Sequence, residues 1–240
     1  MAKIMTDSKH YTDIATAIRE KTGSTEPMKP EEMPGQIGSI KSYSEGYEQG
    51  KIDADITKYT SVLRFNKAVF PDGYELTANC DNMIQLPQFQ GATGIRKATL
   101  YLPLNKAIDG SNCIYANATI EEVVFPNGVK LSTANYFATN CTQLVSVFGA
   151  MDVTGVENEN MFTGCTNLVD VEFVPQTITH NKIFNKSSEL SDASTQSIVD
   201  GLADLTGATA QTLTLHKDVY DKLTDAQKAT IAAKNWEVKY

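Results

Sequence analysis

The sequence has few of the residues that build catalytic, metal or nucleic-acid sites. Its 240 residues include three histidines, four cysteines and one tryptophan. Lysine and arginine number 21 against 29 aspartates and glutamates, so the clustered positive charge of a nucleic-acid groove is missing. No run approaches the 18 apolar residues of a transmembrane helix, and the first residues lack the apolar stretch of a signal peptide. We therefore expect no nucleic-acid binding, no membrane insertion and no signal-dependent secretion.

The motifs in the chain do not assemble into a catalytic or metal-binding constellation. His10, His180 and His216 lie far apart, and none has a partner at an established ligand or nucleophile spacing. No glycine-rich phosphate loop occurs, and the acidic residues in 53–55 and 152–159 lack the spacing of a calcium loop. We expect a protein without enzymatic activity, catalytic residues, bound metal or cofactor.

Asparagine is distributed unevenly along the chain. Of the 15 asparagines, 14 lie between Asn66 and Asn185, and none precedes Asn66. Asparagine tolerates left-handed backbone and hydrogen-bonds to its own turn. This distribution predicts a middle segment rich in tight turns, between two more helical ends.

The N-terminal segment is predicted to form two short helices, over residues 11–21 and 30–40. They carry too little apolar surface to fold alone. Two interpretations follow: a small extension packed on the next domain, or an attachment module that completes its core against a partner or against copies of itself. The second interpretation gives an assembly face made of Ile14, Ile18, Met33 and Ile37.

The middle segment carries an internal repeat of 24 residues. Cys141, Leu144 and Val147 recur as Cys165, Leu168 and Val171, and the corresponding residues one period earlier are Asn117, Ile120 and Val123. A period of 20–29 residues with a short apolar strand is typical of leucine-rich repeats. One such coil cannot bury its inward face, whereas stacked coils share a continuous core. Strands are expected at residues 123–125, 145–148 and 169–173, with a further coil at 94–104.

The cysteines are interpreted through the same repeat. Cys80 has the spacing to Met83 that Cys141 has to Leu144, so Cys80, Cys141 and Cys165 are assigned to one inward position. Small apolar thiols suit such a position. Disulfides or a metal cluster between adjacent coils are the alternative, and the lack of a signal peptide disfavours disulfides.

The C-terminal segment alternates between helical and strand patterns. Helices are expected over residues 195–205 and 226–234, the second capped by Thr224, with a short helix between them. The alternating residues 211–215 and 236–240 predict two strands that pair with each other. Because the last coil of a repeat stack exposes its core, this segment is expected to cover it.

The expected fold class is therefore α+β: short N-terminal helices, a central degenerate leucine-rich-repeat β-solenoid and a C-terminal α+β cap. The expected domains are residues 1–41 (attachment module), 42–59 (connector), 60–190 (repeats) and 191–240 (cap). Aromatic residues of the repeats either pack in the core or stack on sugar rings at the surface. On the second interpretation the candidate receptor surface consists of Tyr74, Phe89, Tyr101 and Tyr136.

Several segments resemble known families. Residues 140–147 and 164–173 are similar to the BspA-like class of leucine-rich repeat, although the fuller lead-in motif of that class is missing. Residues 11–23, with 28–34, resemble an N-terminal module of structural proteins from phages that infect Firmicutes, and 202–215 resembles the ending of such phage and surface proteins.

The resemblance implies a non-enzymatic virion structural protein, assembled in the host cytoplasm and attached to other virion proteins by its N-terminal module. It implies a homo-oligomer, with a trimer as the first expectation, and a repeat domain that binds a host-surface glycan or protein as part of a tail, baseplate or fibre. Two alternatives stay open: a capsid-decorating or purely architectural virion protein, and a bacterial surface adhesin.

Overall fold

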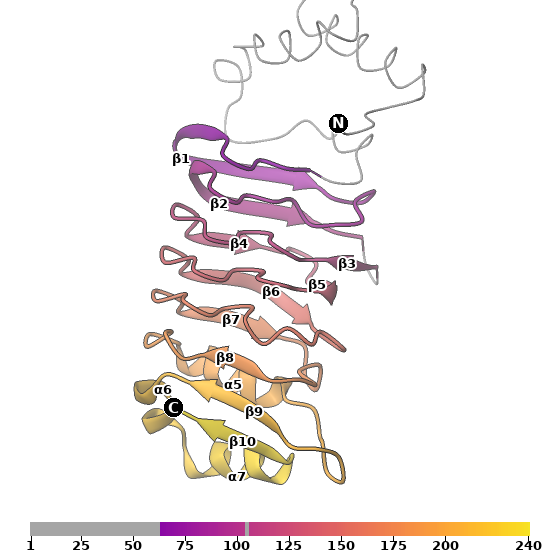
Figure 1. Ribbon diagram of the computed structural model, residues 1–240, viewed down its shortest axis with the longest axis vertical. Coiled ribbons are helices and arrows are strands. Elements are labelled where there is room, and N and C mark those ends of the chain that lie inside the picture. Colours follow the sequence, from indigo (N-terminus) through magenta and orange to yellow (C-terminus); the bar gives the residue numbers. More distant parts are fainter. Residues whose placement is uncertain (1–62, 104–105) are drawn as a thin grey trace, which may run out of the picture. The chain divides into compact units, whose positions relative to one another are not determined.

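The computed structural model describes residues 63–103 and 106–240 of the chain (Figure 1). The described strands are β1 (Val69–Asn79), β2 (Thr93–Tyr101), β3 (Ala107–Asp109), β4 (Glu122–Val124), β5 (Val129–Thr133), β6 (Ser146–Asp152), β7 (Asp170–Phe173), β8 (Lys182–Phe184), β9 (Gln211–Leu215) and β10 (Trp236–Lys239). The described helices are α5 (Asp192–Gly201), α6 (Lys217–Lys222) and α7 (Asp225–Ala233). The expected helices at 11–21 and 30–40 lie outside the described residues, as do the expected domain boundaries near 41 and 59.

The strands pair in parallel and form two sheets (Figure 1). The larger sheet has seven strands in the order β1-β2-β4-β6-β5-β3, and β7 also pairs with β6. The smaller sheet has the order β10-β9-β8. Parallel neighbours require the chain to cross back before it forms the next paired strand, so the chain stacks coil on coil.

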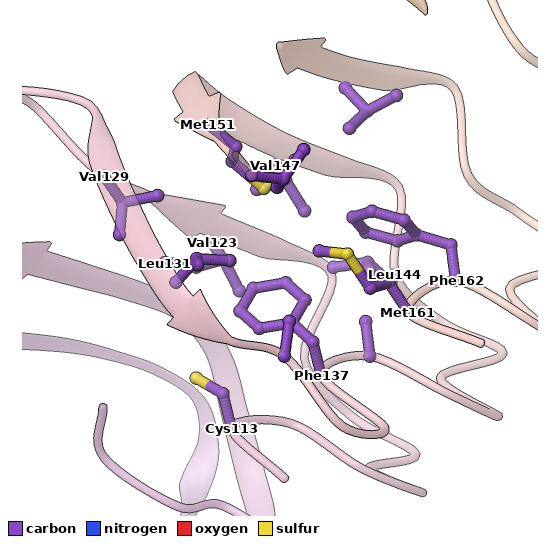
Figure 2. Packing of buried hydrophobic residues seen from close by; sticks show 14 of the residues in the cluster. Cys113, Val123, Val129, Leu131, Phe137, Leu144, Val147, Met151, Met161 and Phe162 are labelled. Atoms are coloured by element: carbon purple, nitrogen blue, oxygen red, sulfur yellow. The ribbon is translucent and has the colours of Figure 1, made fainter. Parts of the chain in front are cut away.

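The 24-residue period predicted from the sequence is confirmed in the central strands. Val123 of β4 pairs with Val147 of β6, which pairs in turn with Val171 of β7. Leu144 and Leu168, which are equivalent residues of the repeat, are completely buried. Figure 2 shows Val123, Val147 and Leu144 among the side chains that fill the interior. One apolar side chain per coil at each inward position makes the core continuous along the stack.

A second column of equivalent residues lies in tight turns that recur in successive coils. In each of six coils a backbone N–H donates to the carbonyl three residues earlier, and the donors are Ala68, Ala92, Asn117, Cys141, Cys165 and Ser187. Cys141 and Cys165 share this column as predicted, but the assignment of Cys80 to it is wrong. Cys80 follows β1, and its N–H donates to the Tyr101 carbonyl at 2.7 Å at the end of β2. Spacing within one coil does not fix the register between coils.

All four cysteines are free and completely buried, as small apolar residues in the core. Burial raises the pKa of the Cys80 and Cys141 thiols to about 12. The Cys141 thiol lies 2.6 Å from the Ile114 carbonyl, and in the preceding coil the buried Asn117 amide donates to the carbonyls of Phe89 and Ala92. The side chain at this position therefore ties its own coil to the coil before it.

The fold class expected from the sequence is wrong. The described chain consists mostly of parallel sheets with few helices, and the larger sheet curls into a half-barrel instead of forming a clear leucine-rich-repeat solenoid. The expectation gave each coil one short strand, whereas the coils carry a second strand after a corner: β3 pairs with β5, and β5 pairs with the last part of β6. At the corner between β4 and β5, Gly128 adopts φ 72°, a left-handed conformation that suits glycine.

The C-terminal elements agree in position with their sequence patterns. β9 pairs with β10, as predicted, with Trp236 opposite Gln211. Thr224 caps α7 in a capping box with Gln227, and α5 begins at Asp192, three residues earlier than expected. β8, which precedes the expected boundary at residue 191, joins the C-terminal sheet by pairing with β9.

Candidate functional site

The structure does not bring the four predicted receptor residues together. Phe89 is completely buried and stacks on Phe65 with ring centroids 5.2 Å apart, so its assignment to the surface is wrong. It belongs to an inward position of its coil, where water is excluded. Tyr74 is half-buried on β1 and packs against Phe70 at 5.1 Å. Tyr101 and Tyr136 are 44% and 48% exposed, but one ends β2 and the other lies in the turn between β5 and β6.

Tyr136 has an unusual backbone conformation for an aromatic residue. Its φ is 55°, in the left-handed region that bulky side chains rarely adopt. The turn holds it there, because the N–H of Asn112 in the preceding coil donates to the Asn135 carbonyl at 2.9 Å. A left-handed non-glycine residue costs about 1–3 kcal/mol relative to an ordinary backbone conformation.

The Tyr136 ring is accompanied by a second tyrosine from the neighbouring coil. The Tyr115 and Tyr136 ring centroids are 5.6 Å apart, and the ring planes are inclined by 52°. Tyr115 is half-buried and Tyr136 is exposed. The pair therefore presents aromatic surface to solvent on the turns after β3 and β5.

A row of hydrogen-bonded polar groups leads into the same turns. The Asp109 carboxylate accepts hydrogen bonds from the Ser111 backbone N–H at 2.8 Å and from the Thr133 hydroxyl. The Ser111 and Thr133 hydroxyl oxygens lie 3.2 Å apart. Ser111 also accepts a hydrogen bond from the N–H of Asn135, the residue before Tyr136. A carboxylate, two hydroxyls and an exposed amide side chain thus adjoin the tyrosine pair, and we call these six residues, Asp109, Ser111, Tyr115, Thr133, Asn135 and Tyr136, the tyrosine–aspartate surface.

The carboxylate in this surface is stabilised in its ionised form. Partial burial would raise the pKa of Asp109, but the hydrogen bonds from Thr133 and Ser111 outweigh it and lower the pKa below its ordinary value. Asp109 is therefore charged at neutral pH. A charged acceptor beside neutral hydroxyls and aromatic faces is a combination that suits a polyhydroxylated ligand.

Sequence reasoning found Tyr136 but missed the other five residues of the surface. Tyr115 is not among the predicted receptor residues, and its ring meets Tyr136 across 21 residues of chain. Asp109 and Thr133 are 24 residues apart, one repeat period, and that spacing is the signal that connects them. The expected assembly face, Ile14, Ile18, Met33 and Ile37, lies outside the described residues.

The two histidines of the described chain make local hydrogen bonds. His180 lies 2.9 Å from the Thr179 hydroxyl, and His216 caps α6 by accepting the Asp218 N–H at 3.2 Å. No three His, Cys, Asp or Glu side chains among the described residues are grouped so that they could hold a metal ion. In the same part of the chain, no helix is long and apolar enough to cross a membrane.

Comparison with known proteins yields no relative: no family model, curated protein or solved structure matches the chain. The residues of the chain itself therefore carry the functional assignment.

Proposed function

We propose that the protein is a non-enzymatic structural component of a phage virion that binds a glycan of the host surface through the tyrosine–aspartate surface. The virion part of the proposal is supported by the resemblance of residues 11–23 to a module of phage structural proteins and of 202–215 to the ending of phage and surface proteins. On this proposal the N-terminal module joins the chain to other virion proteins and the coils are presented to the host.

The observation that carries the binding part is Tyr136, exposed and held at φ 55° beside Tyr115 and the Asp109 row. Sugar rings present apolar C–H faces and a rim of hydroxyls. Aromatic side chains stack on the faces, while carboxylates, hydroxyls and amides exchange hydrogen bonds with the rim. A virion displays many copies of such a protein, so a weak single contact is strengthened by multivalency.

The test is sedimentation of full-length protein with purified cell walls from a panel of Firmicutes. Wild-type protein is expected to sediment with the walls of a susceptible species, and Tyr136→Ala is expected to bind about tenfold more weakly or worse. Tyr101→Ala is the matched control, because Tyr101 has nearly the same exposure but lies at the end of β2. An equal loss of binding in both variants would show that the tyrosine–aspartate surface is not the binding site.

A second variant separates binding from folding. Tyr136→Gly removes the ring and also relieves the left-handed strain, so it is expected to be more stable than Tyr136→Ala and to bind equally poorly. Mass spectrometry of purified particles then tests the virion assignment directly. The virion assignment would be contradicted if the chain were absent from the virions whose other structural proteins are encoded beside its gene.

A further inference from the structure

The two sheets of the molecule end differently. At one end of the larger sheet, helix α5 takes the position that a further strand would occupy. The backbone N–H groups of Val171 and Phe173 on β7 donate to the hydroxyls of Ser194 and Ser197 on α5, each at 2.9 Å. Helix hydroxyls thus satisfy this sheet edge, which removes its tendency to pair with another strand.

The outer edge of β10, by contrast, has no hydrogen-bonded neighbour among the described residues. β10 is the last strand of the smaller sheet and pairs on one side with β9 (Figure 1). Among the described residues, no backbone group donates to or accepts from its other side. An open strand edge presents a row of donors and acceptors on which another strand can pair.

The side chains of β10 alternate between the two faces of the sheet. Trp236 is buried, and its indole N–H donates to the Ala203 carbonyl at 2.9 Å. Val238 is half-buried against the core, whereas Glu237 and Lys239 are exposed. The exposed face of the strand therefore carries one negative and one positive residue, placed symmetrically about Val238.

This charge pattern is complementary to itself in one antiparallel register. Two copies of β10 can pair only in registers that place outward-pointing backbone groups opposite each other. Successive registers of this kind differ by two residues, which moves the two-fold axis by one residue. A two-fold axis at Glu237 would place two glutamates together, and an axis at Lys239 would place two lysines together. An axis at Val238 places Glu237 of each copy opposite Lys239 of the other, and opposite charges in directly facing positions are favourable.

We propose that β10 pairs antiparallel with β10 of a second copy of this chain, about a two-fold axis at Val238. The contact is isologous, so the same residues of each copy contribute, and it joins two three-stranded sheets into one. Trp236 of each copy then faces Tyr240 of the other on the opposite side of the sheet. This inference does not depend on the proposed glycan binding, because the tyrosine–aspartate surface uses other residues.

Cysteine cross-linking in the full chain tests the register. Val238→Cys places two thiols opposite each other at the axis, so mild oxidation is expected to give a covalent dimer on a non-reducing gel. Glu237→Cys is the control, because in this register position 237 faces position 239. The four native cysteines are completely buried, so wild-type protein reports the background. No dimer from Val238→Cys, or a stronger dimer from Glu237→Cys, would overturn the proposal.

Charge reversal tests the contact without new thiols. Glu237→Lys places four lysines at the axis and is expected to raise the dimer dissociation constant about tenfold or more, measured by analytical ultracentrifugation. Lys239→Glu is expected to act in the same direction. The double variant Glu237→Lys with Lys239→Glu restores facing opposite charges, so its dissociation constant is expected to return close to the wild-type value. Failure of the double variant to recover would contradict pairing of these two positions, and both residues are exposed enough for the variants to fold.

Discussion

The hydroxyl of Ser194 on α5 accepts the backbone N–H of Val171 on β7 at 2.9 Å. Both residues are buried, so water cannot replace the serine as acceptor. A side chain thereby completes the hydrogen bonding of a strand, and the change from strand to helix in the stack occurs at this contact.

Replacing this acceptor is expected to destabilise the fold. Ser194→Ala leaves a buried N–H without a partner, which costs about 1–3 kcal/mol of the free energy of unfolding. Urea denaturation followed by circular dichroism measures the loss. Ser132→Ala on the exposed side of β5 is the control and is expected to change stability by less than about 0.5 kcal/mol. Similar values for both variants would show that the Val171 N–H finds another acceptor.

The inward register of the coils leads to a second prediction. Leu144→Ala removes a completely buried side chain and is expected to lower the free energy of unfolding by about 2–5 kcal/mol. Val145→Ala changes the adjacent residue, which is 39% exposed, and is expected to have a much smaller effect. A larger loss at Val145 in the same denaturation experiment would contradict the register.

The third prediction concerns one backbone position that recurs in successive coils. Lys67, Gly91, Ala116, Asn140 and Gly164 all have φ between 49° and 83°. Ala116→Gly removes a Cβ from a left-handed residue and is expected to stabilise the fold by about 0.5–1 kcal/mol. Gly164→Ala is expected to destabilise it by more than that, because the new Cβ would lie 2.4 Å from the Asn140 side-chain oxygen. The shift of the thermal midpoint gives both signs, and two shifts in the same direction would contradict the assignment.

A fourth prediction concerns the buried Lys182. Its ammonium group donates to the backbone carbonyls of Val156, Asn181 and His180 at 3.0, 3.1 and 3.3 Å. Burial lowers the pKa of Lys182 from 10.5 to about 8, and the negative charge of Glu159 opposes this only in part. Between pH 8 and 10.5 the unfolded chain therefore holds this proton more often than the folded chain does. Stability from this group accordingly rises with pH across that window.

The experiment compares wild-type protein with Lys182→Met across pH 7 to 10. The free energy of unfolding of the wild type is expected to increase relative to the variant by on the order of 1 kcal/mol per pH unit between pH 8 and 10. Taking the difference cancels the titration of all other groups. Parallel profiles would mean that Lys182 keeps an ordinary pKa in the folded chain.

The sequence by itself determined the features that depend on local pattern. The 24-residue spacing of Leu144 and Leu168 requires equivalent residues to stack, because only stacking buries them. The alternation in residues 211–215 and 236–240 and the capping box at Thr224 likewise act within a few residues, so the C-terminal strands and the start of α7 could be predicted.

Only the tertiary structure decided the features that depend on register between coils. The second strands β3 and β5 are short, and they are stabilised by pairing with a neighbour more than by their own composition. An aromatic residue in a turn-rich segment can pack in the core or lie on the surface, and only the structure shows that Phe89 packs in the core. Tyr115 contacts Tyr136, and Asp109 contacts Thr133, because successive coils lie side by side. A contact across 21–24 residues depends on the conformation of every intervening turn. The conformational preferences of single residues do not determine that combined geometry.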